Sequence, residues 1–187
     1  EHDRAISDYT AALTCNPDNA DAFFNRARTN YYLGRLEDTV SDYSNVVELS
    51  PEDAEAFNNR GLAYDAQGDY QQALKDYRRA LELRPEFTEA RSNMGAALEA
   101  LGREDDALNE YLLALESAPG FAPAHYNAAR IYSRARNLDR SLHHLEAAVS
   151  LAPQFGAEAE EDDNLAWIMR LGMLKKMRET PEPGTEN

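Results

Sequence analysis

The chain has a single cysteine, Cys15, and no long apolar segment. One cysteine excludes an intramolecular disulfide, and a reducing, cytoplasmic setting is the default expectation. No apolar run approaches the ~20 residues of a membrane-spanning helix, and nothing at the start of the chain has the form of a secretory signal. We therefore expect a cytoplasmic protein that has no membrane partner.

Basic residues are also scarce. The chain carries 34 Asp and Glu against 19 Lys and Arg, so that its formal net charge is −15. Nucleic-acid backbones and anionic membranes both bind clustered Lys and Arg, and the composition argues against either partner. It is compatible with a basic protein partner, although a large net charge also simply favours solubility.

Residues that could support catalysis or metal binding are few. There is no glycine-rich phosphate loop and no nucleophile elbow. His143 and His144 are adjacent on a predicted helix and point about 100° apart, which makes them a poor metal pair, and we expect them and His125 at the surface. Cys15 occupies a slot that holds Leu49 in the following repeat, which indicates packing. We expect no enzymatic activity, no metal and no cofactor.

What the sequence does contain is a period of 34 residues, a spacing typical of repeat arrays. One period, residues 54–87, holds two amphipathic helical patterns with Gly68 between them and Pro85 after the second. Glycine allows a tight turn, and proline ends a helix because it lacks an amide hydrogen. Each unit is therefore a helical hairpin that must stack on neighbours to bury its apolar face. The proline recurs as Pro17, Pro51, Pro85, Pro119 and Pro153.

Small and aromatic residues recur at the same period. The first helices carry a small residue at Ala27, Gly61, Gly95 and Ala129, and the second helices carry a large one at Tyr9, Tyr43, Tyr77, Tyr111 and Leu145. With the turn glycine and the final proline, this pattern over residues 1–155 resembles the tetratricopeptide repeat (TPR) family. The resemblance implies an all-α fold, a right-handed superhelical α-solenoid of stacked helical hairpins with a C-terminal capping helix.

The period divides the chain. Residues 1–19 match only the second helix of a truncated repeat, which is most simply explained if the chain was cut from a longer array. Full repeats follow at 20–53, 54–87, 88–121 and 122–155. We expect the capping helix within 156–178, as Leu165–Arg178 after an acidic run, and a disordered tail at 179–187. The apolar residues of the expected capping helix spread over more than one stripe of its surface. A second interface is therefore an alternative to simple capping, and its candidate residues are Trp167, Ile168, Leu171 and Leu174.

The resemblance further implies that the first helices line a concave groove that binds a partner. One asparagine recurs there in each repeat, and its carboxamide can both donate to and accept from a peptide backbone. The alternative is that asparagine is simply frequent at this position in the family. The expected peptide-binding residues are Asn25, Asn59, Asn93 and Asn127, with Phe24, Arg28, Tyr32, Asn58, Tyr126, Arg130 and Arg134.

Charged residues suggest two further features. Acidic positions in the first repeats and Arg130 and Arg134 in the last predict a partner segment that is mostly basic with an acidic end. Arg26 and Arg60 replace an apolar residue where the second helices carry an aspartate. We expect buried Arg–Asp pairs there that set the register of each hairpin.

The sequence therefore predicts a non-catalytic protein–protein interaction module that holds an extended partner segment in its groove. Two alternatives remain open. The array is the targeting or regulatory arm of a larger enzyme, or it is a scaffold that forms a homodimer through its C-terminal helix.

Overall fold

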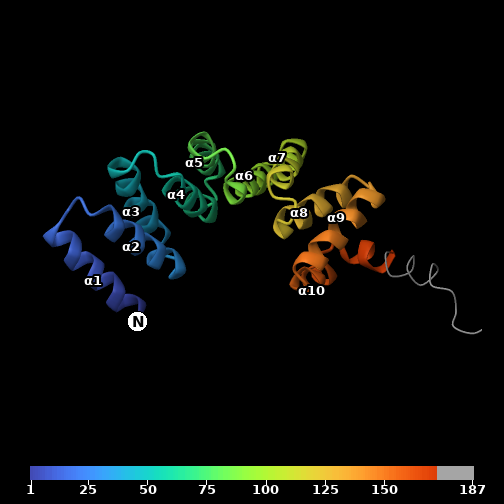
Figure 1. The fold of residues 1–187 in the computed structure, drawn as a ribbon. Helices are drawn as coiled ribbons and strands as arrows, with labels where there is room; N and C mark the ends of the chain where they lie inside the picture. The colour runs from blue at the N-terminus through green and yellow to red at the C-terminus, as the bar shows by residue number, and fades with distance from the viewer. Residues whose placement is uncertain (172–187) are drawn as a thin grey trace, which may run out of the picture. The chain divides into compact units, whose positions relative to one another are not determined.

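The protein is helical throughout the part that the computed structural model describes, residues 1–171 (Figure 1). No strand occurs among these residues. The last described residues, 166–171, are helical as well. The preceding helices are α1 His2–Cys15, α2 Ala20–Tyr32, α3 Leu36–Leu49, α4 Ala54–Ala66, α5 Tyr70–Leu83, α6 Thr88–Ala100, α7 Glu104–Ser117, α8 Ala122–Arg134, α9 Leu138–Leu151 and α10 Gln154–Glu161. The predicted class, an all-α stack of helical hairpins, is confirmed.

The chain forms two compact units, Glu1–Glu110 and Tyr111–Asn187. In the first unit each helix from α1 to α6 packs against the next, and α4 also contacts α6. In the second unit α8 packs against α9, and α9 contacts α10. In both units consecutive helices are therefore neighbours in space, as the short connections between them require.

Helix ends follow from local chemistry. The side chains of Asn19 and Asp53 accept hydrogen bonds from backbone N–H groups in the first turns of α2 and α4, at 3.0 Å from Ala22 N and 2.9 Å from Glu55 N. Each second helix ends two residues before one of the periodic prolines. The turn inside a hairpin needs a left-handed residue, which is Gly68 with φ +80° in one repeat and Arg136 with φ +58° in the last.

The two helices of a hairpin approach most closely at the recurring small residue. A Cβ atom added to Gly61 of α4 would lie 2.7 Å from Cε1 of Tyr77 on α5. Tyr77 is fully buried, so its ring has nowhere to move. The recurring glycine or alanine is thus what allows the large residue opposite it to fill the hairpin core.

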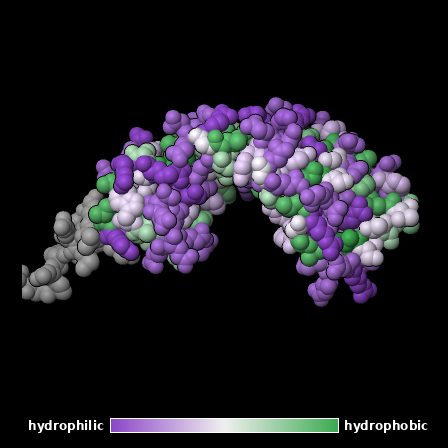
Figure 2. All heavy atoms as spheres, turned by 180° about the vertical axis from the view of Figure 1, so that it is seen from behind, coloured by the Kyte–Doolittle hydropathy of each residue, from purple (hydrophilic) through white to green (hydrophobic). Residues whose placement is uncertain are grey.

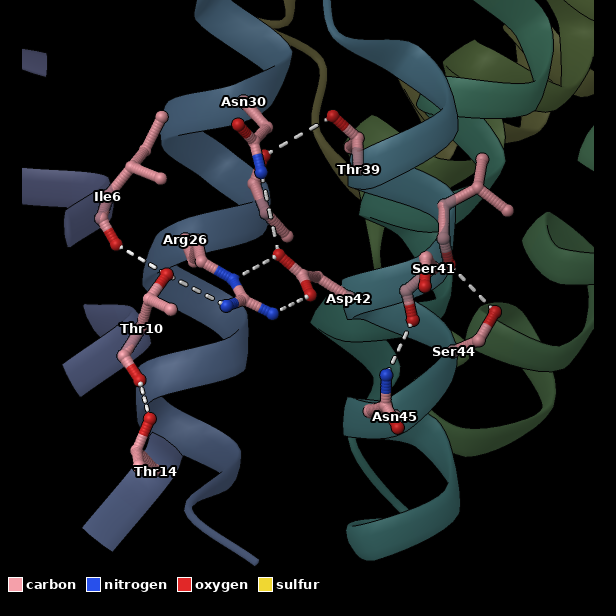
Figure 3. Close-up of polar contacts among 12 residues, drawn as sticks. Ile6, Thr10, Thr14, Arg26, Asn30, Thr39, Ser41, Asp42, Ser44 and Asn45 are labelled. Carbon is pink, nitrogen blue, oxygen red and sulfur yellow. Dashed lines mark hydrogen bonds and ion pairs between the residues drawn. The ribbon is translucent and has the colours of Figure 1, made fainter. Parts of the chain in front are cut away.

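A polar pair joins the two helices of each of the first two full hairpins. Arg26 Nε and Nη2 donate to the carboxylate oxygens of Asp42 at 2.8 and 2.7 Å (Figure 3). Arg60 pairs in the same way with Asp76 at 2.7 and 2.8 Å. The aspartates are 5% and 8% exposed in their side chains and the arginines 21% and 17%. The predicted inter-helix Arg–Asp pairs are confirmed. Asp8, the matching residue of α1, is exposed.

The C-terminal segment differs from the prediction in its helices. Residues 158–161, which the sequence predicts only as an acidic run before the capping helix, belong to helix α10. The chain then turns before the helical stretch 166–171. Ala159, Leu165 and Ile168 are buried in one core cluster with Leu145 and Ala148 of α9. The segment therefore covers the apolar side of the last hairpin, as a cap does. Leu174 and the predicted tail lie outside the described residues.

Replacing Gly61 by Ala is expected to destabilise the protein by about 1–2 kcal/mol. The clash with Tyr77 costs ~1–3 kcal/mol, and the better helix propensity of alanine returns only up to ~1 kcal/mol. Urea unfolding of both proteins measures the difference. In a Tyr77→Leu background, which copies the Ala129 and Leu145 pair of the last hairpin, the same replacement should no longer destabilise. An equal loss in both backgrounds would contradict the close approach.

Replacing Asp76 by Ala is expected to cost about 3 kcal/mol, because it leaves the guanidinium of Arg60 without its carboxylate inside the hairpin. The double variant Arg60→Met with Asp76→Ala should recover most of this loss, since no stranded charge remains. Chemical unfolding of the single and double variants measures both values. A double variant that is no more stable than the single one would show that the pair itself, rather than the stranded charge, carries the energy.

Candidate functional site

The predicted binding face of the first unit lies on α2 and α4, and a hollow of about 240 Å³ opens there. Tyr32 stands at this hollow with 71% of its surface exposed, the most exposed large apolar or aromatic side chain in the described residues. Arg28 and Glu55 add one charge of each sign. The lining residues are Arg28, Tyr31, Tyr32, Tyr43, Glu55, Asn59 and Leu62. Burial raises the pKa of the Tyr43 phenol, so this group stays protonated and neutral in the wall.

The predicted asparagines are partly engaged with one another. Asn93 Nδ2 donates to Asn58 Oδ1 at 3.0 Å, and Asn58 Nδ2 donates to Asn59 Oδ1 at 3.2 Å. Asn58 is buried and joins α4 to α6, so it supports the face rather than offering itself to a partner. Asn59 and Asn93 are half-buried at the ends of this chain of carboxamides.

Asn25 is held within its own helix. Its Nδ2 donates to the Asp21 carbonyl oxygen at 2.8 Å, and its Oδ1 accepts from Arg28 Nη2 at 3.1 Å. The four asparagines therefore share a repeat position but not one bonding pattern. Phe24, also predicted to contact a partner, packs edge-on against Tyr43, with their ring centroids 5.3 Å apart.

In the second unit, the C-terminal segment contacts several of the side chains that were predicted to face a partner. Tyr126 is 8% exposed and stacks on Phe155 with ring centroids 4.8 Å apart. Asp162, in the turn after α10, pairs with Arg130 Nε at 3.3 Å. Burial and the Asp162 carboxylate raise the pKa of Tyr126 to about 12.

These contacts leave less of α8 accessible to a partner than the sequence predicts. Arg130 has an intramolecular carboxylate, and Tyr126 belongs to the core of the unit. Arg134 is partly buried, and Asn127 accepts a hydrogen bond from Arg130 at 3.5 Å. The aperiodic sequence after residue 156 carried no sign that its Asp162 would reach α8.

The residues of the candidate second interface differ in their exposure. Ile168 is 1% exposed and Trp167 is partly buried against the core, where the Arg136 guanidinium lies 5.4 Å from its ring centroid. Leu171 is 43% exposed. Within the described residues, only Leu171 of the named set is well placed to meet a partner.

Sequence reasoning missed a polar pair in each of the last two full repeats. Arg91 Nη1 lies 3.1 Å from Glu110 Oε2, and Arg91 Nη2 donates to the Pro85 carbonyl at 3.0 Å. His125 takes the same two roles one period later, with Nε2 3.0 Å from the Pro119 carbonyl and Nδ1 2.9 Å from His144 Nδ1. The signal was present in the sequence. The last two full repeats lack the arginine of positions 26 and 60, and each carries a polar donor three residues earlier in the same helix, at position 91 or 125.

The histidines are thus not simple surface groups. His125 and His144 are half-buried and face each other, whereas the adjacent His143 is exposed. If His125 donates to Pro119 through Nε2, a neutral His125 must accept at Nδ1, so His144 carries its proton on Nδ1. Burial, with His125, His143 and Arg140 nearby, lowers the pKa of His144 to about 4.

Other kinds of site find little support. Among residues 1–171, no group of three or more His, Cys, Asp and Glu side chains is placed to hold a metal ion. None of the helices described there is long and apolar enough to cross a membrane. On the face drawn in Figure 2, hydrophilic residues prevail and hydrophobic ones form small, separate patches.

Comparison with known proteins identifies the repeat. Sequence models of the tetratricopeptide repeat match residues 8–40, 54–87 and 122–155, and a TPR repeat model matches residues 27–68. No curated protein sequence matches this chain.

Solved structures share the fold. The crystal structure of MamA is similar with a TM-score of 0.75 and 22% identity, over 83% of this chain and 91% of that chain. TTC0263, a thermophilic TPR protein of Thermus thermophilus, is similar with a TM-score of 0.68 and 22% identity, over 92% of this chain and 91% of that one. At this identity the likeness extends to the fold alone.

Acidification is expected to weaken the second unit through His144. Its pKa is lower in the folded protein than the usual 6.5, so the unfolded chain binds the extra proton between about pH 6.5 and pH 4, and stability falls as the pH falls through that window. The loss between pH 7 and pH 4.5 should be about 1–2 kcal/mol, after a discount for solvent screening. Urea unfolding at both pH values measures it.

The control is a comparison of two glutamine variants. His144→Gln should remove this part of the pH dependence, whereas His143→Gln at the exposed neighbour should retain it. Carboxylates titrate in all three proteins alike, so only the difference between them counts. Identical pH profiles for wild type and His144→Gln would contradict the assignment.

Proposed function

Because this chain belongs to the tetratricopeptide repeat family, whose repeats serve in protein–protein interaction, we propose that it is a non-catalytic interaction module that binds an extended segment of a partner protein. The binding face is that of the first unit, on α2, α4 and α6. The observation that carries this proposal is the hollow beside Tyr32 and Asn59, next to the carboxamide chain that links α4 to α6.

The hollow supplies the anchor. An exposed tyrosine offers a large, rigid surface at low cost in conformational entropy, and such side chains are enriched at binding sites. Tyr32 and Leu62 give apolar contact, and Arg28 and Glu55 give charge on either side. A partner side chain placed here would be held against the wall formed by Tyr43.

The carboxamides supply backbone contacts. Asn93 uses one of its two N–H groups on Asn58, which leaves its Oδ1 for a peptide N–H. Asn59 uses its Oδ1 to accept from Asn58, so its own N–H groups are the side that suits a peptide carbonyl. One donor and one acceptor on neighbouring helices suit a peptide backbone, whose own groups alternate in the same way.

Charge indicates the class of partner. Asp21, Glu55 and Glu89 are exposed on the first turns of α2, α4 and α6, and the whole chain carries −15. A partner segment with Lys or Arg would be attracted and would associate faster at low salt. The acidic end that Arg130 and Arg134 suggested loses its support, because Arg130 already pairs with Asp162.

The test is a random-peptide display library screened against the purified chain. We expect enriched peptides with basic residues and affinities of about 10 μM, or about −7 kcal/mol. Tyr32→Ala should weaken them at least about tenfold, since it removes contact area from a largely exposed side chain without cost to the core. The double variant Asn59→Ala with Asn93→Ala should do the same.

Asn45→Ala is the matched control. Asn45 lies on the second helix α3 and, like Asn25, donates to the carbonyl four residues earlier in its helix. This variant should bind as the wild type does. Thermal melts must accompany the double variant, because Asn93→Ala also takes a donor from the buried Asn58. Peptides that bind wild type, Tyr32→Ala and the double variant equally well would place the site elsewhere.

A further inference from the structure

A carboxylate lies next to the hollow on α2 and α4, beyond the residues that line it. Asp65 follows Leu62 by three residues, so it lies on the same face of α4, about 4.5 Å further along the helix axis. One period separates Asp65 from Tyr31 of α2, which lines the hollow. Residues about one period apart on successive first helices are neighbours in space, as the contact between Asn58 and Asn93 shows.

Asp65 and Tyr31 also lie close to the same buried phenol. Burial, the Asp65 carboxylate and the Tyr31 hydroxyl all raise the pKa of Tyr77. Because the effect of one charge on another falls with distance, both residues border the same part of the face. Tyr77 itself is fully buried and stays protonated, so it brings no charge to Asp65.

Asp65 is a carboxylate without a cation. It is half-buried, and burial raises the pKa of its carboxyl because a charge that loses water is disfavoured. Among residues 1–171, no Lys or Arg side chain forms an ion pair with it. A cation brought to Asp65 from outside would stabilise the charged carboxylate.

The other charges at the hollow leave room for one cation. Arg28 and Glu55 carry opposite charges, so that the Asp65 charge is the one that is not offset. Arg28 Nη2 donates to Asn25 Oδ1 at 3.1 Å, which turns its guanidinium toward the start of α2. Tyr31 and Asp65 lie instead near the ends of α2 and α4.

The protein itself shows how a guanidinium is held between a ring and an aspartate. Arg60 Cζ lies 5.6 Å from the centroid of the Phe57 ring, and two nitrogens of the same side chain donate to Asp76. The first full hairpin repeats this arrangement with its own arginine. In Tyr31 and Asp65, the face beside the hollow offers the same two groups to an arginine of another molecule.

We propose that Tyr31 and Asp65 bind an arginine side chain of the partner segment, an inference that rests on the proposed function of this face. The stem of the arginine lies over Leu62 at the hollow. Its guanidinium stacks on the Tyr31 ring, and two of its N–H groups donate to the Asp65 carboxylate. A stem of three methylenes is long enough to cover the rise from Leu62 to Asp65.

Charge and shape favour arginine over other side chains. A neutral side chain would leave the half-buried carboxylate without a cation, and an acidic one would be repelled by it. A lysine carries the charge, but its ammonium is a compact, strongly hydrated group that neither stacks flat on a ring nor spans both carboxylate oxygens. Lysine should therefore bind more weakly than arginine.

The test is an amide-shift NMR titration of the whole chain with N-acetyl-L-argininamide. We expect saturable shifts at Tyr31, Leu62 and Asp65, with a Kd in the millimolar range, as suits so small a probe. N-acetyl-L-citrullinamide has nearly the same shape and no charge. It should bind at least about tenfold more weakly, because it forms no charge-assisted pair.

Two variants with the same change in net charge make the assignment specific. Asp65→Asn keeps the shape of the side chain and should weaken the arginine probe at least about tenfold, while the citrulline probe binds as before. Asp8→Asn, at an exposed position of α1 in the same unit, is the matched control and should bind the arginine probe as the wild type does. Melting temperatures check that both variants fold, which we expect because Asp65 has no internal cation to lose.

The outcome is separable from that of the proposed function. The titration uses no partner segment, so it decides on the arginine site even if the library yields no peptide. Library peptides that lose binding to the Asn59 and Asn93 double variant but are indifferent to Asp65→Asn would support the proposed function and contradict the inference.

The titration alone can also overturn the inference. It does so if the arginine probe gives no saturable shifts, or if the citrulline or lysine analogue binds the wild type as tightly as the arginine probe. It does so as well if Asp65→Asn binds the arginine probe as the wild type does, or if Asp8→Asn weakens the probe as much as Asp65→Asn.

Discussion

The close approach of the two helices in each hairpin is the constraint on which the other features depend. At Gly61 there is no room for a Cβ atom beside the buried Tyr77. This short distance brings Arg60 within direct reach of Asp76 and lets a charged pair form where the helices meet. On the same helix, Asn59 and Leu62 line the outer hollow.

The polar contact between helices persists along the chain although its residues change. Arg26 and Arg60 reach an aspartate, Arg91 reaches Glu110 from one turn earlier in its helix, and His125 reaches His144. A partly buried polar group must find a partner, so losing the arginine at one position favours a donor at another. Where two imidazoles stand in place of the ion pair, burial lowers the pKa of His144, and the stability of the last hairpin is expected to depend on pH.

The residues predicted to bind a partner are accessible to different degrees in the two units. In the first unit Tyr32 remains exposed and a hollow opens beside it. In the second unit Tyr126 and Arg130, at repeat positions that a partner would meet, are engaged by Phe155 and Asp162 of the segment that follows the last repeat. An end hairpin must cover its apolar face, and covering it uses side chains that an inner hairpin leaves available.

Periodicity in the sequence was enough to predict the hairpins, the positions of their turns and the Arg26–Asp42 type of pair, because each depends on residues at a constant spacing within one repeat. The pairing of Arg130 with Asp162 was not predictable in this way. It depends on which side chains of the aperiodic segment after residue 156 lie within about 3 Å of α8. Such distances follow from packing in three dimensions, which a repeat pattern constrains but does not specify.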